Sequence, residues 1–303
     1  MTNKTNKSII LTGVKAVMAN WNADFDGQPK QRLDGTFYAS PFALKYAIKD
    51  YWKEKGLPVM GTPTFKPDVA GGFTASTQEA RFNSLFPDIV KKAGKIEVLS
   101  HFMKPLDLRT FGVVATKPEN FGFKGVVQVS DGINVYKDTQ AYMDDLTAPY
   151  ASKEGVAQTT IGKRSFIDFG LYNYSIIVNP SHLSVFNTLL PEDEKIEYTE
   201  DDYFNLKDGL RNAVSNLNSL PKMGCSNSYT LVIELKEDSS FISAELTNLV
   251  QVSKDLENDK TILDFKRVQD FLNSYAHKIE SYVLYADTFT QDIVNWDSEI
   301  EVL

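Results

Sequence analysis

Three lysines spaced by four residues are the first candidates for chemistry. Lys45, Lys49 and Lys53 stand in a segment, residues 40–54, whose apolar residues recur at helical spacing. A helix there would align the three ammonium groups on one face. Cations at one-turn spacing can follow a chain of phosphates without reading bases. The row could also be an ordinary solvated face paired with Asp50 and Glu54, and the sequence leaves both interpretations open.

The segment before this helix adds two cations and a helix start. Lys30 and Arg32 stand in a stretch rich in Asp, Gly, Asn, Gln and Pro, residues 22–36, which is typical of a loop. Ser40 is a good N-cap and Pro41 suits the first helical position. If the loop lies beside the helix start, its cations and the Ser40 hydroxyl would join the lysines in one phosphate-binding track.

Acidic residues in the same loop offer a second kind of chemistry. Asn22, Asp24, Asp26 and Gly27 imitate the first half of a calcium loop. Leu33 stands at the twelfth position, where a bidentate Glu is required, so an EF-hand is excluded. The aspartates could still hold a metal or act as acid–base groups, although a solvated turn is the simpler interpretation.

A polar stretch, residues 130–163, shows no core pattern and is expected to be irregular. Two adjacent cations at its foot, Lys163 and Arg164, could hold a nucleic-acid backbone or be ordinary surface charges. An exposed arm with apolar side chains could also wedge into a base stack or pack on a neighbouring subunit. The candidates for this wedge are Tyr142, Met143 and Leu146.

The sequence lacks the common catalytic motifs. Its three histidines, His101, His182 and His277, are scattered, and no G-x-S-x-G, P-loop or H-E-x-x-H occurs. The single cysteine, Cys225, excludes an internal disulfide framework and a cysteine-based zinc site. We therefore expect no enzymatic activity, no catalytic residue, no metal and no cofactor.

The charge is unevenly distributed along the chain. The net charge is −8, but residues 1–130 hold 18 Lys and Arg against 11 Asp and Glu, whereas residues 166–303 hold 10 against 24. This asymmetry fits a basic working surface and an acidic remainder, although such imbalance is also common. Binding phosphate requires a local basic track and not a basic protein.

Neither a membrane span nor a secretory signal is expected. The sequence has no run of about 18 apolar residues, and its first seven residues are polar. We therefore expect a cytoplasmic protein with no membrane partner.

The pattern of elements predicts an α+β fold. Strands are expected at 8–21, 96–100, 107–115, 125–129, 166–178, 229–235 and 280–285, and helices at 40–54, 78–92, 204–217 and 263–275. Without insertions the order is β-α-β-β-α-β, the ferredoxin-like order of RNA-recognition (RRM-like) domains. We predict a single domain over residues 1–303, with insertions at 57–95 and 130–163 and a C-terminal extension at 237–303.

Several short motifs, kept in order over residues 9–235, resemble one family. It is the DevR-like CRISPR-associated backbone family (the Cas-seven family), the spine of Cascade-type complexes, and the type I-B branch is most similar. The motifs are the Asn22 loop with Arg32, Asp34, Ser40 and Lys45; Asp107-Leu108-Arg109-Thr110-Phe111-Gly112; Gly125-Val126-Val127-Gln128; Ile161-Gly162-Lys163-Arg164 with Phe169-Gly170-Leu171-Tyr172; and Met223 to Ser226. Lys45-Tyr46 replaces the family's Lys-Arg pair, and Val126 replaces its Pro.

The resemblance implies a hand-shaped subunit. The ferredoxin-like core would be the palm, residues 57–95 the fingers and 130–163 the thumb. Copies would stack into a filament along a CRISPR RNA, together with other Cascade subunits, and the guide would pair with target DNA. The RNA contacts implied by the motifs and the basic track together are Asn22, Lys30, Arg32, Ser40, Lys45, Lys49, Arg109, Lys163 and Arg164.

Two other interpretations remain open. Related backbone subunits of type III complexes cut RNA with a loop aspartate, a role that Asp24, Asp26 or Asp34 could take with a metal ion. The chain could also be a ferredoxin-like protein with another role, because many functions share that fold.

Overall fold

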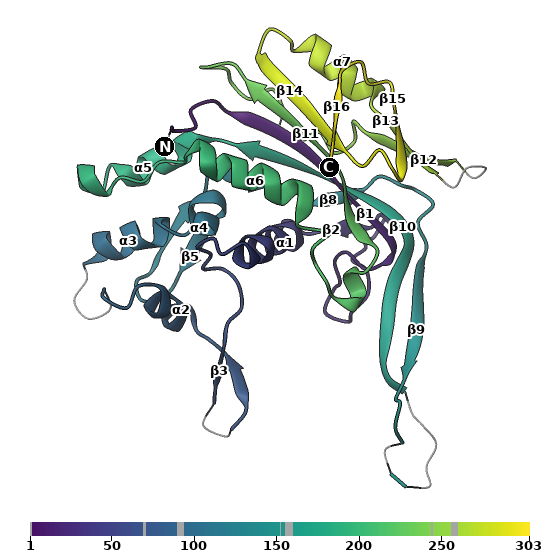
Figure 1. Cartoon of the computed structure of the whole chain (residues 1–303), viewed down its shortest axis with the longest axis horizontal. Helices are drawn as coiled ribbons and strands as arrows, with labels where there is room; N and C mark the ends of the chain where they lie inside the picture. Colours follow the sequence, from purple (N-terminus) through teal and green to yellow (C-terminus); the bar gives the residue numbers. More distant parts are fainter. Residues whose placement is uncertain are drawn as a thin grey trace.

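A central sheet organises the molecule (Figure 1). The computed structural model describes residues 2–68, 71–89, 94–151, 153–154, 160–243, 245–255 and 260–303. Within these residues the strands of the main sheet lie in the order β16-β14-β11-β1-β10-β8-β2, and β7 and β9 also pair with β10. Their bounds are β1 Ser8–Ala19, β2 Tyr38–Ala39, β7 Val127–Val129, β8 Gly132–Asn134, β9 Ala141–Thr147, β10 Thr160–Val178, β11 Cys225–Leu235, β14 Ile279–Ala286 and β16 Ile300–Val302.

The central strands are apolar on both faces because the sheet is covered on both sides. In β1, Ile10 and Val14 belong to the core cluster on one face, whereas Ile9 and Leu11 belong to the cluster on the other. Successive side chains of a strand point to opposite faces, so this strand reads as a nearly continuous apolar run. Its register with β10 is antiparallel and starts at the pair Ser8–Val178.

Two long helices cover one face of the sheet, α1 (Pro41–Glu54) and α6 (Glu200–Asn212). Helix α1 begins after an extended Ser40 with Pro41 in its first turn, as predicted, and buries Leu44, Ala47, Ile48, Tyr51 and Trp52. Helix α6 begins with a capping box in which Thr199 and Asp202 exchange hydrogen bonds. The two helices meet closely because Gly209 has no side chain, and a Cβ there would lie 3.0 Å from Cγ2 of Ile48.

The first insertion and the segment after it contain two helices where the sequence predicted strands. The elements are β3 Phe65–Pro67, β4 Phe73–Ala75, α2 Gln78–Leu85, α3 Lys95–Met103, α4 Leu106–Phe111, β5 Gly112–Ala115 and β6 Phe121–Lys124. The strand predicted at 96–100 is wrong, because the side chains that α3 buries, Val98, Leu99, Phe102 and Met103, repeat at helical spacing. The strand predicted at 107–115 is correct only from Gly112 onward.

The described second insertion contains a long hairpin, so the irregular structure predicted for residues 130–163 is wrong for 132–134, 141–147 and 160–163, whereas residues 152 and 155–159 lie outside the described residues. Strand β9 pairs with the first half of β10 from Ala141–Ile167 to Thr147–Thr160. All seven residues of β9 are exposed, so its sequence carries no buried period that pattern analysis could detect. Figure 1 shows this hairpin and the β3 region as two separate projections that both extend toward the bottom of the view, away from the sheet.

The C-terminal segment covers the second face of the sheet. It contains β12 (Gln251–Asp255), β13 (Lys260–Asp264), α7 (Lys266–Ser274) and β15 (Gln291–Val294). Phe265 and Val268 pack there in the same cluster as Ile9 and Leu11. The remaining short elements are η1 Pro180–Leu183, α5 Ser184–Asn187, η2 Glu192–Glu194 and η3 Leu220–Lys222. Among the described residues, none of the helices has the length and apolar character that crossing a membrane requires.

The single cysteine offers a direct probe of this packing. Cys225 is buried, and burial raises the pKa of its thiol to about 12. Because the thiolate is the reactive form, we expect alkylation by iodoacetamide at about pH 8 to be over a hundredfold slower in the folded protein than in urea. Mass spectrometry of quenched time points measures both rates, and equal rates would contradict the burial of this strand end.

Candidate nucleic-acid interface

The loop between β1 and α1 is a structured hairpin fastened to the helix start. Isolated bridges join Ala23 to Pro29 and Gln31 to Phe37. The side-chain Oδ1 of Asn22 accepts the backbone N–H of Ser40 at 2.8 Å. Asn22, a predicted RNA contact, therefore fixes the loop against the N-terminus of α1.

Lys30 and Arg32 come together around one aromatic ring. The Lys30 ammonium lies 5.8 Å and the Arg32 guanidinium 5.6 Å from the centroid of the Tyr38 ring. Such contacts stabilise cations at a partly exposed surface by about 0.5–1 kcal/mol. Tyr38 follows Phe37 and precedes Ala39, both buried in the cluster that contains α1, so Tyr38 projects to the other face of this edge.

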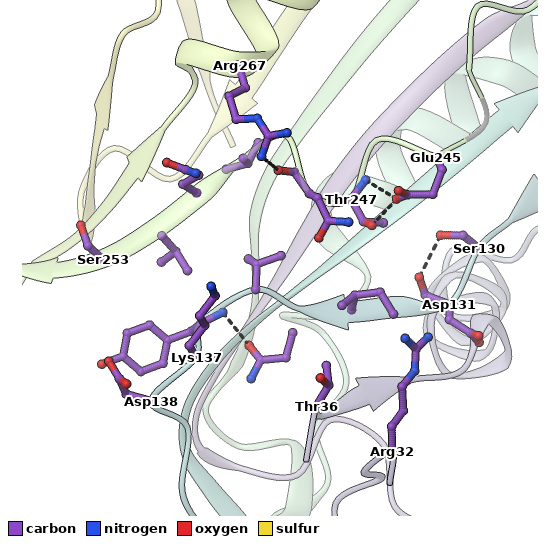
Figure 2. A pocket seen from close by; sticks show the side chains of 18 of the residues that line it. Arg32, Thr36, Ser130, Asp131, Lys137, Asp138, Glu245, Thr247, Ser253 and Arg267 are labelled. Atoms are coloured by element: carbon purple, nitrogen blue, oxygen red, sulfur yellow. Dashed lines mark hydrogen bonds between the residues drawn. The ribbon is translucent and has the colours of Figure 1, made fainter. Parts of the chain in front are cut away.

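Arg32 also lines a cleft of about 1190 Å³ between the β2–β8 edge of the sheet and the C-terminal segment. Figure 2 shows Arg32 and Asp131 at one end, Lys137 and Asp138 at another, and Arg267 across the opening. Glu245 lies there as well, where it accepts hydrogen bonds from Thr247. Charges of both signs thus surround Arg32.

Lys45 and Lys49 lie elsewhere, on the side of α1 that faces α4. The Lys45 ammonium is 5.4 Å from the centroid of the Phe111 ring, and both lysines are half-buried. Neither lines the cleft that contains Arg32. The predicted single track is therefore corrected: the loop cations and the helix lysines contact different parts of the molecule.

The positive charges of Lys45 and Lys49 are only partly balanced by nearby negative charge. Burial lowers the pKa of Lys45, and repulsion from Lys49 lowers it further. Burial also lowers the pKa of Lys49, while attraction to Asp107 opposes that change. In the described parts of the chain, no ion pair joins these lysines to Asp50 or Glu54, the partners that the solvated-face interpretation suggested.

Such a pair of cations is suited to bind an anion. Bringing two ammonium groups together in a partly desolvated place is unfavourable, and a phosphate between or beside them would relieve that repulsion. The interaction is stronger than on an open surface because the surrounding protein excludes part of the solvent. Lys53, the third member of the row, is exposed.

Arg109 is not a free cation. Its Nε and Nη2 donate to the two carboxylate oxygens of Asp202 at 2.9 and 2.6 Å, and Nη1 donates to the Lys104 carbonyl. The phosphate contact of Arg109 stays a prediction, made less favourable because a bidentate carboxylate occupies the guanidinium and only 16% of the side chain is exposed.

Lys163 and Arg164 diverge because they are neighbours on a strand. Arg164 stacks on Phe166 at 4.7 Å and donates to the Met18 carbonyl, whereas Lys163 is exposed on the opposite face.

The three residues of the predicted wedge also lie on two different faces of their strand. Tyr142 stacks on Phe166 and lies on the same face of β9 as Leu146. Met143 lies on the opposite face of that strand.

The loop aspartates stabilise turns. Asp24 Oδ1 accepts the N–H groups of Asp26 and Gln28, and Asp34 Oδ1 accepts that of Thr36. The hydrogen bonds from Thr36 lower the pKa of Asp34. In the part of the chain that the structure describes, no group of three His, Cys, Asp or Glu side chains is arranged to hold a metal ion.

Sequence reasoning missed two residues beside the lysines, Asp107 and Gly61. Asp107 is 1% exposed and accepts the backbone N–H groups of Met60 and Gly61. Pro105 followed by an acidic residue is a helix-start signal that could have placed Asp107 in the first turn of α4. The contact of Asp107 with residues 60–61 joins distant parts of the chain, so no local sequence pattern could have predicted it.

The fold and the site together define a mixed α/β protein with two partly desolvated cations on one helix, one of them near the carboxylate of Asp107. Residues 6–271 match the family described as CRISPR-associated protein Cas7, which is most of the chain, so the chain belongs to this family.

Two solved structures are similar to the chain over nearly its whole length. One is described as "CRISPR RNA-guided surveillance complex, pre-nicking", with 11% identity, 97% of this chain and 96% of that chain covered, and a TM-score of 0.49. The other is described as "CRISPR RNA-guided surveillance complex", with 11% identity, 95% of each chain covered, and a TM-score of 0.46. No protein of curated function matches the chain.

Proposed function

We propose that the protein is a guide-RNA-binding backbone subunit of a type I Cascade complex. The observation that carries this proposal is the family match over residues 6–271. The half-buried pair Lys45 and Lys49 supplies the physical reason for placing backbone phosphates against α1. The motifs around Asn22 and Lys163 favour the DevR-like, type I-B branch.

The palm of the proposed subunit is a ferredoxin-like unit. Its support is the strand order β11-β1-β10-β8, with α1 following β1 and α6 following β10, both on one face. Residues 57–95 would then be fingers and residues 130–163 a thumb, formed largely by the β9–β10 hairpin. The exposed Tyr142, Met143 and Leu146 would contact bases or a neighbouring copy from two faces of this thumb.

In this proposal the subunit performs no chemistry. Of the three aspartates that the cleavage alternative considers, Asp24, Asp26 and Asp34, the first and the last accept backbone hydrogen bonds within their own loop. The proposed partners are the CRISPR RNA, target DNA through the guide, further copies of the chain in a filament, and other Cascade subunits, in the cytoplasm.

The double variant Lys45→Ala/Lys49→Ala tests the proposal. We expect its affinity for a single-stranded RNA to fall by about tenfold or more, and the slope of log K against log [KCl] to become shallower by about 1.4, since each lost phosphate contact to a single strand contributes about 0.7. Fluorescence anisotropy over a series of KCl concentrations measures both, and the RNA is expected to stay intact with Mg²⁺.

The matched control removes the same charge elsewhere. Lys236→Ala/Lys278→Ala alters two lysines beside the start of β14, where Lys236 N–H donates to the Lys278 carbonyl. This control should change the affinity by less than about twofold, since distant charges are screened. Equal losses in the two double variants would reject a specific role for α1.

A further inference from the structure

Lys49 lies in a small assembly made by three separate segments. Asp107, in the first turn of α4, accepts the N–H of Met60 through Oδ1 at 2.9 Å and the N–H of Gly61 through Oδ2 at 2.7 Å. The carboxylate thereby fastens the start of the finger insertion to α4. Its negative charge also attracts the Lys49 ammonium on α1.

Gly61 completes the assembly by having no side chain. A Cβ at this position would lie 2.8 Å from Oδ2 of Asp107, 3.1 Å from Nζ of Lys49 and 3.6 Å from Cδ of Lys49. The end of the Lys49 side chain therefore rests against the bare backbone of Gly61. Because the 2.8 Å approach to Oδ2 of Asp107 is too short, an added methyl would displace this carboxylate together with the flexible ammonium of Lys49.

We propose that Asp107 and Gly61 are positioning residues that hold the Lys49 ammonium in the place where it meets an RNA phosphate. This inference rests on the proposed function and adds the residues that restrain its cation. An unrestrained lysine loses side-chain entropy when it binds, and a lysine held in position before binding loses less. Asp107 attracts the ammonium from one side and leaves its other N–H donors for phosphate.

The test uses Gly61→Ala, which changes no charge. Asp107→Ala would also leave two backbone N–H groups without acceptors and so loosen the insertion itself. We expect Gly61→Ala to bind single-stranded RNA about two- to tenfold more weakly than the unaltered protein, with a lowered urea midpoint because the added methyl crowds the buried carboxylate of Asp107. Gly94→Ala is the matched control, because a Cβ at Gly94 would meet nothing within 4 Å, and its RNA affinity should be unchanged.

A double-mutant cycle separates positioning from general damage. In the Lys49→Ala background, Gly61→Ala should have no further effect on RNA affinity, because the side chain that it displaces is gone. Equal losses in both backgrounds, or no loss in the unaltered background, would overturn the inference while leaving the proposed function intact. If Lys49→Ala alone left RNA affinity unchanged, the phosphate contact would fail, and the inference with it.

Discussion

Asp202→Ala is expected to lower the free energy of unfolding by about 3–5 kcal/mol, because it removes a helix cap and leaves a mostly buried guanidinium without its counter-ion. Asp202 is 4% exposed and holds Arg109 through two hydrogen bonds. The same carboxylate accepts the Thr199 N–H in the capping box of α6. The substitution thus removes an ion pair and a helix cap together. The midpoint of urea unfolding, followed by circular dichroism, measures the loss.

Two comparisons separate these contributions. Asp201→Ala, one residue earlier in the same turn, removes an exposed acid and should cost about 0.3–1 kcal/mol. In an Arg109→Met background no charge is left unpaired, so Asp202→Ala should cost only about 1 kcal/mol, the value of the cap. A cost that is the same in both backgrounds would show that the ion pair contributes nothing.

Trp52→Ala is expected to cost about 3–5 kcal/mol, the usual range for deleting a buried aromatic side chain. Trp52 is fully buried in α1, stacks on Phe111 with ring centroids 5.7 Å apart, and donates its Nε1–H to the Asn205 carbonyl at 2.9 Å. It therefore joins α1 to both α4 and α6. Because Lys45 rests on Phe111, RNA affinity should fall along with stability. Urea unfolding and anisotropy measure the two effects.

Conservative and exposed substitutions provide the controls for Trp52. Trp52→Phe keeps a ring against Phe111 and loses the indole hydrogen bond to the Asn205 carbonyl, so a smaller cost of about 1–3 kcal/mol is expected. Phe42→Ala changes an aromatic residue of the same helix that is 75% exposed, and it should change stability by no more than about 0.5 kcal/mol. If Trp52→Ala were as mild as Phe42→Ala, the joining role of this side chain would be wrong.

Helix α1 shows what local sequence signals can predict. Its start at Ser40-Pro41 and its buried side are confirmed, because the fixed backbone of Pro41 and a 3.6-residue period act within a few residues, although the Ser40 side chain makes no capping hydrogen bond. Helix α3 shows where such signals fail. Its isoleucine and valine favour a strand, but its side chains pack against Phe82 and other core residues in a helical arrangement, and this tertiary packing outweighs the local preference. The sequence did not predict the β9–β10 hairpin, because every residue of β9 is exposed and the strand therefore has no alternation of buried and exposed residues.

The sequence by itself determined the α+β class, the helix that carries Lys45 and Lys49, and the motifs of the Cas7 family. Only the tertiary structure decided which predicted cations are free. Arg109 donates hydrogen bonds to Asp202, which is 93 residues away in the sequence. Lys49 lies beside residues 60–61 and Asp107, which come from two other segments of the chain. The physical reason is that the environment of a charge depends on distances in space, which long-range packing sets, whereas sequence patterns report only neighbours along the chain.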